Sequence, residues 1–249
     1  MANPRHLDHA PITEALIDIH VEHRDGLSFT ALQDALSTLD FGYYIKNPLS
    51  QGTFGFKLTS DGQRPQTTAE STQIGLRLHS SDEKYVAQCR LAGFTLSRLP
   101  PYESWPSLLE ETKRVWSVYR GRLAPRTVTR LATRFINNLR LPLEHGESFQ
   151  TYLRKFADVP DEAPQALTSF FQRFQLLDIP SNAFVKLTLA LESTPPGGRA
   201  PVILDVDAFT TTNMDPEDDE LWNVLEHLRK LKNQCFFGSL TERAVELYE

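Results

Sequence analysis

The chain has 249 residues, of which 40% are hydrophobic, and it carries a net charge of −6. This length and apolar content predict a folded globular protein of one large domain or two small ones. The negative charge argues against a protein devoted wholly to nucleic acid or to an anionic membrane.

The N-terminal stretch MANPRHLDHAP lacks the apolar core of a signal peptide. No apolar run approaches the roughly 18 residues that a membrane-spanning helix needs. Cys89 and Cys235 stand in apolar runs without metal-binding spacing. We therefore expect a soluble, cytoplasmic protein with buried thiols and no membrane partner.

The first half of the sequence predicts strands and helices in an α+β order. Apolar and polar residues alternate over 12–22, which predicts a half-buried strand. A serine and one apolar helical face predict a helix over 28–39. Further strands are predicted at 41–47, 52–60, 73–80 and 85–97, with a polar loop at 62–73 and a turn at 81–84.

The stretch GFTLSRLPPYESW, residues 93–105, is predicted to join a hairpin to a covering helix. Phe94 and Trp105 are the expected core anchors, and Pro100 and Pro101 fix the turn between them. Apolar residues then recur at helical spacing, which predicts a helix ending near Gly121.

A similar order of elements returns in the second half of the chain. The matching pairs are Thr13 and Thr133, Phe29 and Phe149, Phe94 and Phe209, and Trp105 and Trp222, at offsets between 115 and 120 residues. The second set of elements is a strand at 133–143, a helix at 148–156, a hairpin at 183–193 and 200–209 around a turn at 194–199, and a helix opening at Trp222.

This repetition predicts internal duplication. The expected fold is α+β, with pseudo-repeated halves at 1–125 and 126–249 that share or abut antiparallel sheets, with helices covering one face. One integrated domain remains the alternative for the domain division. The alternative to duplication is chance, because any α+β chain of this length offers two strand-helix pairs.

The chain also resembles a known group of proteins. The segments HAPITEA, FTLSRLPPYESWPSLLEE, WSVYRGRLAPRTVTRLATRFINNLRLP and LTER are similar to those of a sporadically distributed bacterial family of uncharacterised proteins about 250 residues long. The resemblance implies that the recurrent residues are Pro11, Glu14, Phe94, Tyr102, Trp105, Arg134 and Asn137. It attaches no activity to them, and the patchy distribution implies a role in a defence or mobile-element gene cluster by analogy alone.

Familiar catalytic and cofactor motifs are missing from the sequence: GxxxxGK[ST], GxGxxG, GxSxG and HExxH do not occur. The pairs His6 with His9 and His20 with His23 lack a helical context, so we expect no metal site and no cofactor. The DVD run at 205–207 places two carboxylates on one strand face, and we expect them to be solvated rather than metal-binding.

One basic pattern stands out in this acidic protein. Five arginines, namely Arg122, Arg126, Arg130, Arg134 and Arg140, all fall on even positions and share one face wherever the segment is extended. Such a row can follow a phosphate backbone, or it can pair with Glu14, Asp18 and Glu22 on the even face of the first strand. Pairing is favoured for Arg134 and Arg140, while Arg122 and Arg126 are expected to stay free for a ligand.

The proposed duplication gives one explicit contact. It sets the first strands of the two halves side by side, with Glu14 and Arg134 on one face of a shared sheet, where they should form an ion pair. Asn137 should lie on the opposite face, near the centre of its strand.

Three functions from different classes follow from these observations. The favoured one is a non-catalytic binding or adaptor protein that holds a protein partner or a small ligand, with homo-oligomer formation as an additional expectation. The second is an unrecognised hydrolase or transferase that uses Glu14, Asp18, Arg134 and Asn137 in one cleft. The third is a nucleic-acid binder that uses the arginine row.

Overall fold

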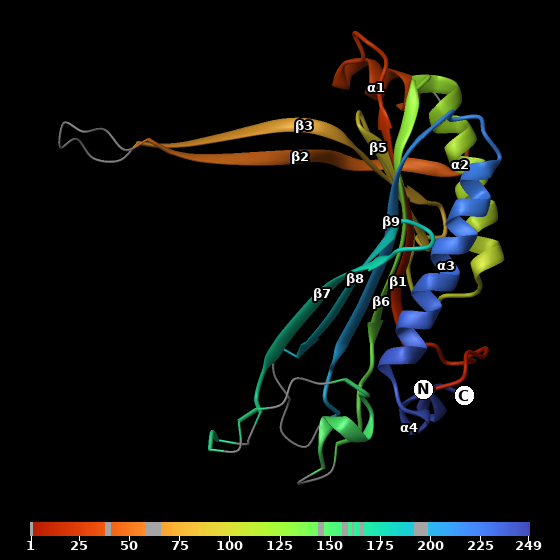
Figure 1. Ribbon diagram of the computed structural model, residues 1–249. Coiled ribbons are helices and arrows are strands. Elements are labelled where there is room, and N and C mark those ends of the chain that lie inside the picture. Colours follow the sequence, from red (N-terminus) through yellow and green to blue (C-terminus); the bar gives the residue numbers. More distant parts are fainter. Residues whose placement is uncertain are drawn as a thin grey trace.

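A single antiparallel sheet of nine strands organises the computed structural model of the chain (Figure 1). The structure describes residues 2–37, 41–57, 66–143, 147–155, 159–160, 162–164, 167–191 and 199–249, with only the backbone described at 53–57 and 66–70. The strand order is β2-β3-β4-β5-β1-β6-β9-β8-β7. The predicted α+β class is therefore confirmed, and strands from both predicted halves belong to the same sheet.

The strands are β1 (Ile12–Glu22), β2 (Tyr43–Lys57), β3 (Gln66–Ser80), β4 (Tyr85–Arg90), β5 (Gly93–Arg98), β6 (Thr127–Asn138), β7 (Phe170–Asp178), β8 (Ala183–Leu191) and β9 (Ile203–Met214). The α-helices are α1 (Phe29–Ser37), α2 (Trp105–Leu123), α3 (Glu220–Ser239) and α4 (Glu242–Val245), and the 3₁₀ turns are η1 (Phe149–Thr151) and η2 (Glu246–Tyr248). None of these helices is long and apolar enough to cross a bilayer.

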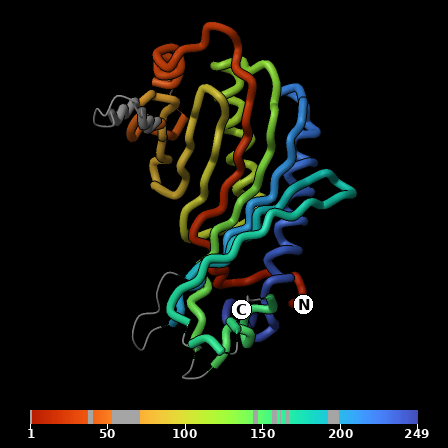
Figure 2. Tube along the Cα trace, turned by 60° about the vertical axis from the view of Figure 1, so that its left-hand side comes forward, coloured from red at the N-terminus to blue at the C-terminus, as the bar shows by residue number. Residues whose placement is uncertain are grey.

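β1 and β6 form the central strand pair of the sheet, with β5 on the other side of β1 (Figure 2). Ile17 of β1 lies opposite Thr133 of β6, and both are fully buried. Because partners in an antiparallel pair share a face, the odd residues of the regular stretches 15–19 of β1 and 131–135 of β6 point to the same side. β5 can approach β1 closely because residue 93 is glycine, where a Cβ would lie only 2.8 Å from the carbonyl oxygen of Ile19.

α2 packs on β5 and β1, on the side of the sheet that carries Phe94. The helix begins where the sequence predicts it, because the Ser104 side chain caps it by accepting a hydrogen bond from the Ser107 amide. Trp116 and Tyr119 of the helix pack on the Phe94 ring at centroid distances of 6.0 and 5.8 Å. Phe94 is fully buried and Trp105 nearly so, which confirms both as core anchors.

α3 lies beside α2 on the right of Figure 1 and packs on β6, β9 and β8. The two helices are joined by side chains: the Trp105 indole donates to Glu226 at 2.5 Å, and Lys113 lies over the Trp222 ring at 5.2 Å. Trp222 is half-buried and packs against the core, although less completely than Trp105.

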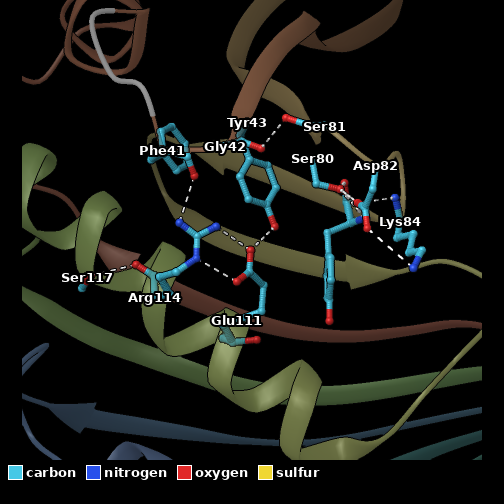
Figure 3. A network of polar contacts seen from close by, with 12 residues as sticks. Phe41, Gly42, Tyr43, Ser80, Ser81, Asp82, Lys84, Glu111, Arg114 and Ser117 are labelled. Carbon is cyan, nitrogen blue, oxygen red and sulfur yellow. Dashed lines mark hydrogen bonds and ion pairs between the residues drawn. The ribbon is translucent and has the colours of Figure 1, made fainter.

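β2 and β3 extend away from the rest of the sheet as a two-stranded arm (Figure 1). The base of the arm is fastened to α2 (Figure 3). There the Tyr43 hydroxyl donates to Glu111 at 2.7 Å, and Arg114 donates to both oxygens of the same carboxylate at 2.8 and 2.6 Å. Arg114 also donates to the carbonyl of Phe41, which secures the chain just before β2.

Three element predictions in the first half are wrong. The separate strands predicted at 41–47 and 52–60 form the single strand β2 over the described residues. Residues 66–73, predicted as part of a polar loop, belong to β3, because backbone pairing with β2 supports a strand whose side chains need no core. Residues 62–65 of that loop lie outside the described part of the chain. The strand predicted at 85–97 is divided into β4 and β5 by a turn at Leu91 and Ala92.

The helix predicted at 148–156 is also wrong, because the described part, 148–155, forms only the short turn η1. Here the backbone pairs with the chain at the end of α3. The backbone amide of Arg154 donates to the carbonyl of Ser239, and the Thr241 amide donates to the carbonyl of Tyr152. The sequence did not assign β7. The turn predicted at 194–199 lies outside the described residues except for Arg199.

Phe94 and Phe209, which the duplication predicts to be equivalent, lie on opposite faces of the sheet. Phe94 pairs with Ile19 on the helix side, whereas Phe209 pairs with Ala132, whose other neighbour Asp18 points to the opposite side. Phe209 therefore lies on the face away from α2 and α3.

We expect Trp116→Ala to lower the free energy of unfolding by about 3–5 kcal/mol, because its ring is 2% exposed and packs on Phe94. Trp222→Ala is the matched control, and its half-buried ring should cost clearly less. Urea unfolding of the two variants measures the difference, and equal losses would contradict the packing described here.

Candidate functional site

Six charged side chains gather on the sheet face opposite α2 and α3, and we call them the charged cluster. They come from the four strands β4, β1, β6 and β9: Asp18, Arg90, Arg130, Arg134, Asp205 and Asp207. Ile17 and Ile19 are fully buried on the helix side, so Asp18 between them must point to the other face. The cluster thus follows from strand alternation at the centre of the sheet.

Asp18 is the centre of the cluster. Its carboxylate accepts hydrogen bonds from Arg90 at 2.6 Å and Arg130 at 2.7 Å. Thr95 donates to it at 2.6 Å, and Nε2 of His20 lies 2.9 Å away. Burial by itself raises the pKa of Asp18, but the His20 hydrogen bond and the charge of Arg90 outweigh it and hold that pKa well below its usual range.

Arg134 and Asp205 form the second part of the charged cluster. The guanidinium donates to both oxygens of Asp205, at 2.8 and 2.7 Å, and this bidentate contact raises the pKa of Arg134. Asp207 lies 3.6 Å from Arg130, and burial raises its pKa. The prediction that the DVD carboxylates are solvated is therefore wrong, because β6 supplies an arginine partner to each.

The predicted contact between Glu14 and Arg134 is half right. The register places Glu14 opposite Ile136 and Arg134 opposite Leu16, so the two side chains share a face as expected. They do not form an ion pair. β9 brings Asp205 closer to Arg134, and its carboxylate occupies the guanidinium fork.

The arginine row is interrupted at both ends. Arg122 lies on the last turn of α2, and Arg140 follows the end of β6 with a positive φ of 36°. Arg126 precedes β6, and it forms an ion pair with Asp25 and lies 3.8 Å from Glu22, so the expectation that it is free is wrong. The predicted pairing with the first strand is wrong for Arg134, whose partner is Asp205 of β9, and no ion pair of Arg140 is seen in the described part of the chain.

Asn137 lies on the face opposite Arg134, as predicted, but near the end of β6 and not at its centre. Its amide nitrogen donates to the carbonyl of Leu204 at 2.9 Å. Glu14, Asp18 and Arg134 share the other face, so the four residues of the enzyme hypothesis do not meet in one cleft.

A pocket of about 510 Å³ opens on the helix side of the sheet, next to Asn137. Its walls are the N-terminal segment before β1, the loop and first turn of α2, and the second half of α3. The lining includes Pro11, Tyr102, Trp105, Phe135, Asn137 and Lys232. Its volume is within the range of small-molecule sites, about 300–1,000 Å³.

Lys232 is the distinctive residue of the pocket. It is 7% exposed, and no described residue accepts a hydrogen bond from its ammonium or forms an ion pair with it. Its Nζ lies 3.5 Å from the centroid of the Phe135 ring. Burial, followed by the charge of Arg229, lowers the pKa of Lys232 to about 7.

The other charged groups of the pocket have partners. Arg229 donates to Glu226 at 2.7 Å, and Glu103 accepts from Arg98 at 2.7 Å. Arg5 forms ion pairs with Glu242 and Glu249 near the C-terminus, which hold the N-terminal wall in place. His6 and Asp8 are exposed and lie 3.4 Å apart at the rim. Lys232 is thus the uncompensated charge among the described residues that line the pocket.

Sequence reasoning missed Lys232 although a signal for it exists. Leu221, Leu225, Leu228 and Phe236 follow the spacing of a buried helical stripe, and Lys232 falls on that stripe where an apolar residue is expected. A lysine in such a position is unusual, because lysine is almost never fully buried without a partner.

Neither family models nor curated proteins offer a match that could assign a role to these residues: no family model matches the chain, and no curated protein matches its sequence. Among the described residues, no group of three or more His, Cys, Asp or Glu side chains could hold a metal ion. The site must therefore be interpreted from its own geometry.

A double-mutant cycle tests the pairing of Arg134. We expect Arg134→Met and Asp205→Asn to be coupled by about 0.5–3 kcal/mol in the free energy of unfolding, because they share a bidentate contact. Arg134→Met with Glu14→Gln is the matched cycle and should show clearly weaker coupling, because the charge of Glu14 acts on Arg134 without a direct contact. Strong coupling to Glu14 and none to Asp205 would overturn the pairing described here.

Asp18 should make the protein acid-sensitive. Because its pKa is lower in the folded than in the unfolded state, its contribution is present above about pH 4 and lost as the pH falls further. We expect Asp18→Asn to lose about 3–5 kcal/mol at pH 7, since it removes the carboxylate partner of Arg90 and leaves Arg130 with Asp207 alone, and to show a flatter acid dependence. Asp25→Asn, which removes an exposed carboxylate, is the control in urea unfolding at neutral and acidic pH.

Proposed function

We propose that this protein is a non-catalytic binding protein, and that its pocket holds a small ligand with an apolar ring and an anionic group. The observation that carries the proposal is Lys232, a buried lysine that has no counter-ion among the described residues and stands in the wall of a 510 Å³ pocket. Tyr102, Trp105 and Phe135 give the same pocket an aromatic surface.

The energies favour a ligand anion beside Lys232. A cation over an aromatic ring gains about 2 kcal/mol when it is desolvated. Burying an ion costs several kcal/mol, even after relaxation of the protein. The contact with Phe135 therefore leaves part of the cost of burial uncompensated, and an anionic group of a ligand would offset it.

The other two functions have weaker support. An enzyme that uses Glu14, Asp18, Arg134 and Asn137 would need them in one cleft, yet they lie on two faces of the sheet. A nucleic-acid binder would need free cations, yet Arg130 and Arg134 of the row are neutralised by Asp18, Asp205 and Asp207.

Membership of the sporadic bacterial family, and with it an accessory role in a defence or mobile-element cluster, is a further proposal that rests on the resemblance alone. The pocket adds one supporting fact, because four of the residues that the resemblance marks as recurrent line it: Pro11, Tyr102, Trp105 and Asn137. The division into halves at 1–125 and 126–249 by duplication is also a proposal. Its support is the strand order, since β1, β5, β4 and β3 lead outward from the centre as β6, β9, β8 and β7 do.

Removing the buried charge should stabilise the protein. Because the pKa of Lys232 is lowered to about 7, the unfolded chain binds more protons between pH 7 and about 10, and wild-type stability rises over that range. We expect Lys232→Met to be more stable than wild type by about 1–4 kcal/mol at pH 6, with the advantage shrinking towards pH 9. Lys230→Met, which removes an exposed charge on the same helix, is the control in urea unfolding.

Benzoate tests the binding proposal, because it combines a ring with a carboxylate. We expect isothermal titration calorimetry to detect benzoate binding to the wild type and to Lys230→Met, at least tenfold weaker binding to Lys232→Met, and none of benzamidine, which has the opposite charge. Equal binding of benzoate to wild type and Lys232→Met, or no binding to either, would overturn the assignment of Lys232 as the anion partner.

A further inference from the structure

The large hydrophobic side chains that the described surface exposes are concentrated at one edge of the sheet. Five of the six lie on β7 or directly after it: Phe171, Phe174, Leu176, Leu177 and Ile179. Their exposed fractions range from 41% to 81%, and the sixth residue is Tyr44 on the arm. We call residues 170–179 the β7 edge.

The β7 edge also lacks the proline and the register shifts that protect the other edge of the sheet. The other edge strand, β2, carries Pro48 and two register shifts, which interrupt pairing with an incoming strand. β7 pairs with β8 in an unbroken register and contains neither proline nor a bulge. Its outer backbone groups therefore form a regular template for another strand.

The apolar residues are found on both sides of this template. Phe171 and Leu177 lie opposite Ala190 and Phe184 of β8, on the face of the charged cluster. Phe174 and Leu176 lie opposite Leu187 and Val185, on the helix face. An incoming strand would bury apolar surface on both sides at once.

We propose that β7 of one copy pairs antiparallel with β7 of a second copy, centred on Phe174, so that the sheet continues through a twofold-symmetric dimer.

In this register the β7 side chains of one copy are complementary to those of the other. Phe174 meets its own copy at the axis, and each Phe171 faces a Leu177. Arg173 faces Gln175, so no like charges meet. A register centred on Arg173 would set two guanidinium groups directly opposite each other, which is unfavourable. Because one segment supplies both partners with matching residues, a second copy fits the edge.

The size of the contact sets the expected affinity. A stable interface uses about 20–30 residues from each partner, and the β7 strand has nine. Ladder hydrogen bonds and the four apolar side chains on each copy add to it, so we expect dimers that dissociate in the micromolar range.

Analytical ultracentrifugation tests the dimer through Phe174→Lys, which would place two like charges at the axis. We expect the wild type to change from monomer to dimer as its concentration rises through the micromolar range, and Phe174→Lys to remain a monomer with unchanged circular dichroism and melting. Tyr44→Lys alters the exposed hydrophobic residue outside the β7 edge and should dimerise like the wild type. A wild type that stays monomeric at high micromolar concentration, or a Phe174→Lys variant that dimerises normally, would overturn the proposal.

Mild oxidation of Phe174→Cys gives an independent readout of the register, since directly opposite residues in an antiparallel pair are close enough for a disulfide. We expect covalent dimers from Phe174→Cys and none from Tyr44→Cys. Crosslinking of Tyr44→Cys alone would show that the other edge forms the contact.

Discussion

The antiparallel pairing of β1 with β6 is the constraint on which the rest of the structure depends. These strands join the two halves of the chain at the centre of one sheet, and their register decides which side chains share a face. With Ile17 opposite Thr133, the odd residues of 15–19 and 131–135 enter the core beneath the helices, and the even residues of these stretches meet on the other side. A slip of one residue would exchange the two sets, which is why burial on one face specifies the register so strongly.

The alternation of side chains along β1 and β6 places the charged cluster on one face of the sheet and the pocket with Lys232 on the other. On the face of the charged cluster, Asp18 and Asp205 accept hydrogen bonds from arginines of other strands, so each of these buried carboxylates has a partner. On the helix side, Phe135 and Asn137 line the pocket, where Lys232 has an aromatic neighbour and, within the described part of the chain, no counter-ion. Removing one partner of a compensated pair would leave a buried charge alone, whereas the uncompensated Lys232 already lowers stability, a cost that the proposed ligand would offset.

The two edge strands of the sheet differ in how readily another strand could pair with them. β2 is fastened at its base by Tyr43, Glu111 and Arg114, and its proline and register shifts interrupt pairing (Figure 3). β7 has a regular backbone and apolar side chains on both faces. The pocket lies near the N- and C-terminal segments on the helix side, so pairing at the β7 edge and ligand binding in the pocket would use separate surfaces.

Local patterns in the sequence determined the elements whose burial is periodic. The alternation at 12–22 is β1, and the apolar spacing after Ser104 is α2, because each pattern reports a single face packed on a core. Polar residues 66–73 were misassigned, since the β2–β3 arm is held by backbone pairing that leaves no apolar pattern. The sequence placed Glu14 and Arg134 on one face, yet only the neighbouring strand β9 decided that Asp205 is the partner of Arg134. Likewise, the helical stripe contains Lys232, but the lack of a counter-ion depends on the segments that surround it in space. The face of a helix or strand on which a side chain lies follows from periodicity along the chain. The residue with which that side chain pairs depends on contacts between distant segments, which only the tertiary structure decides.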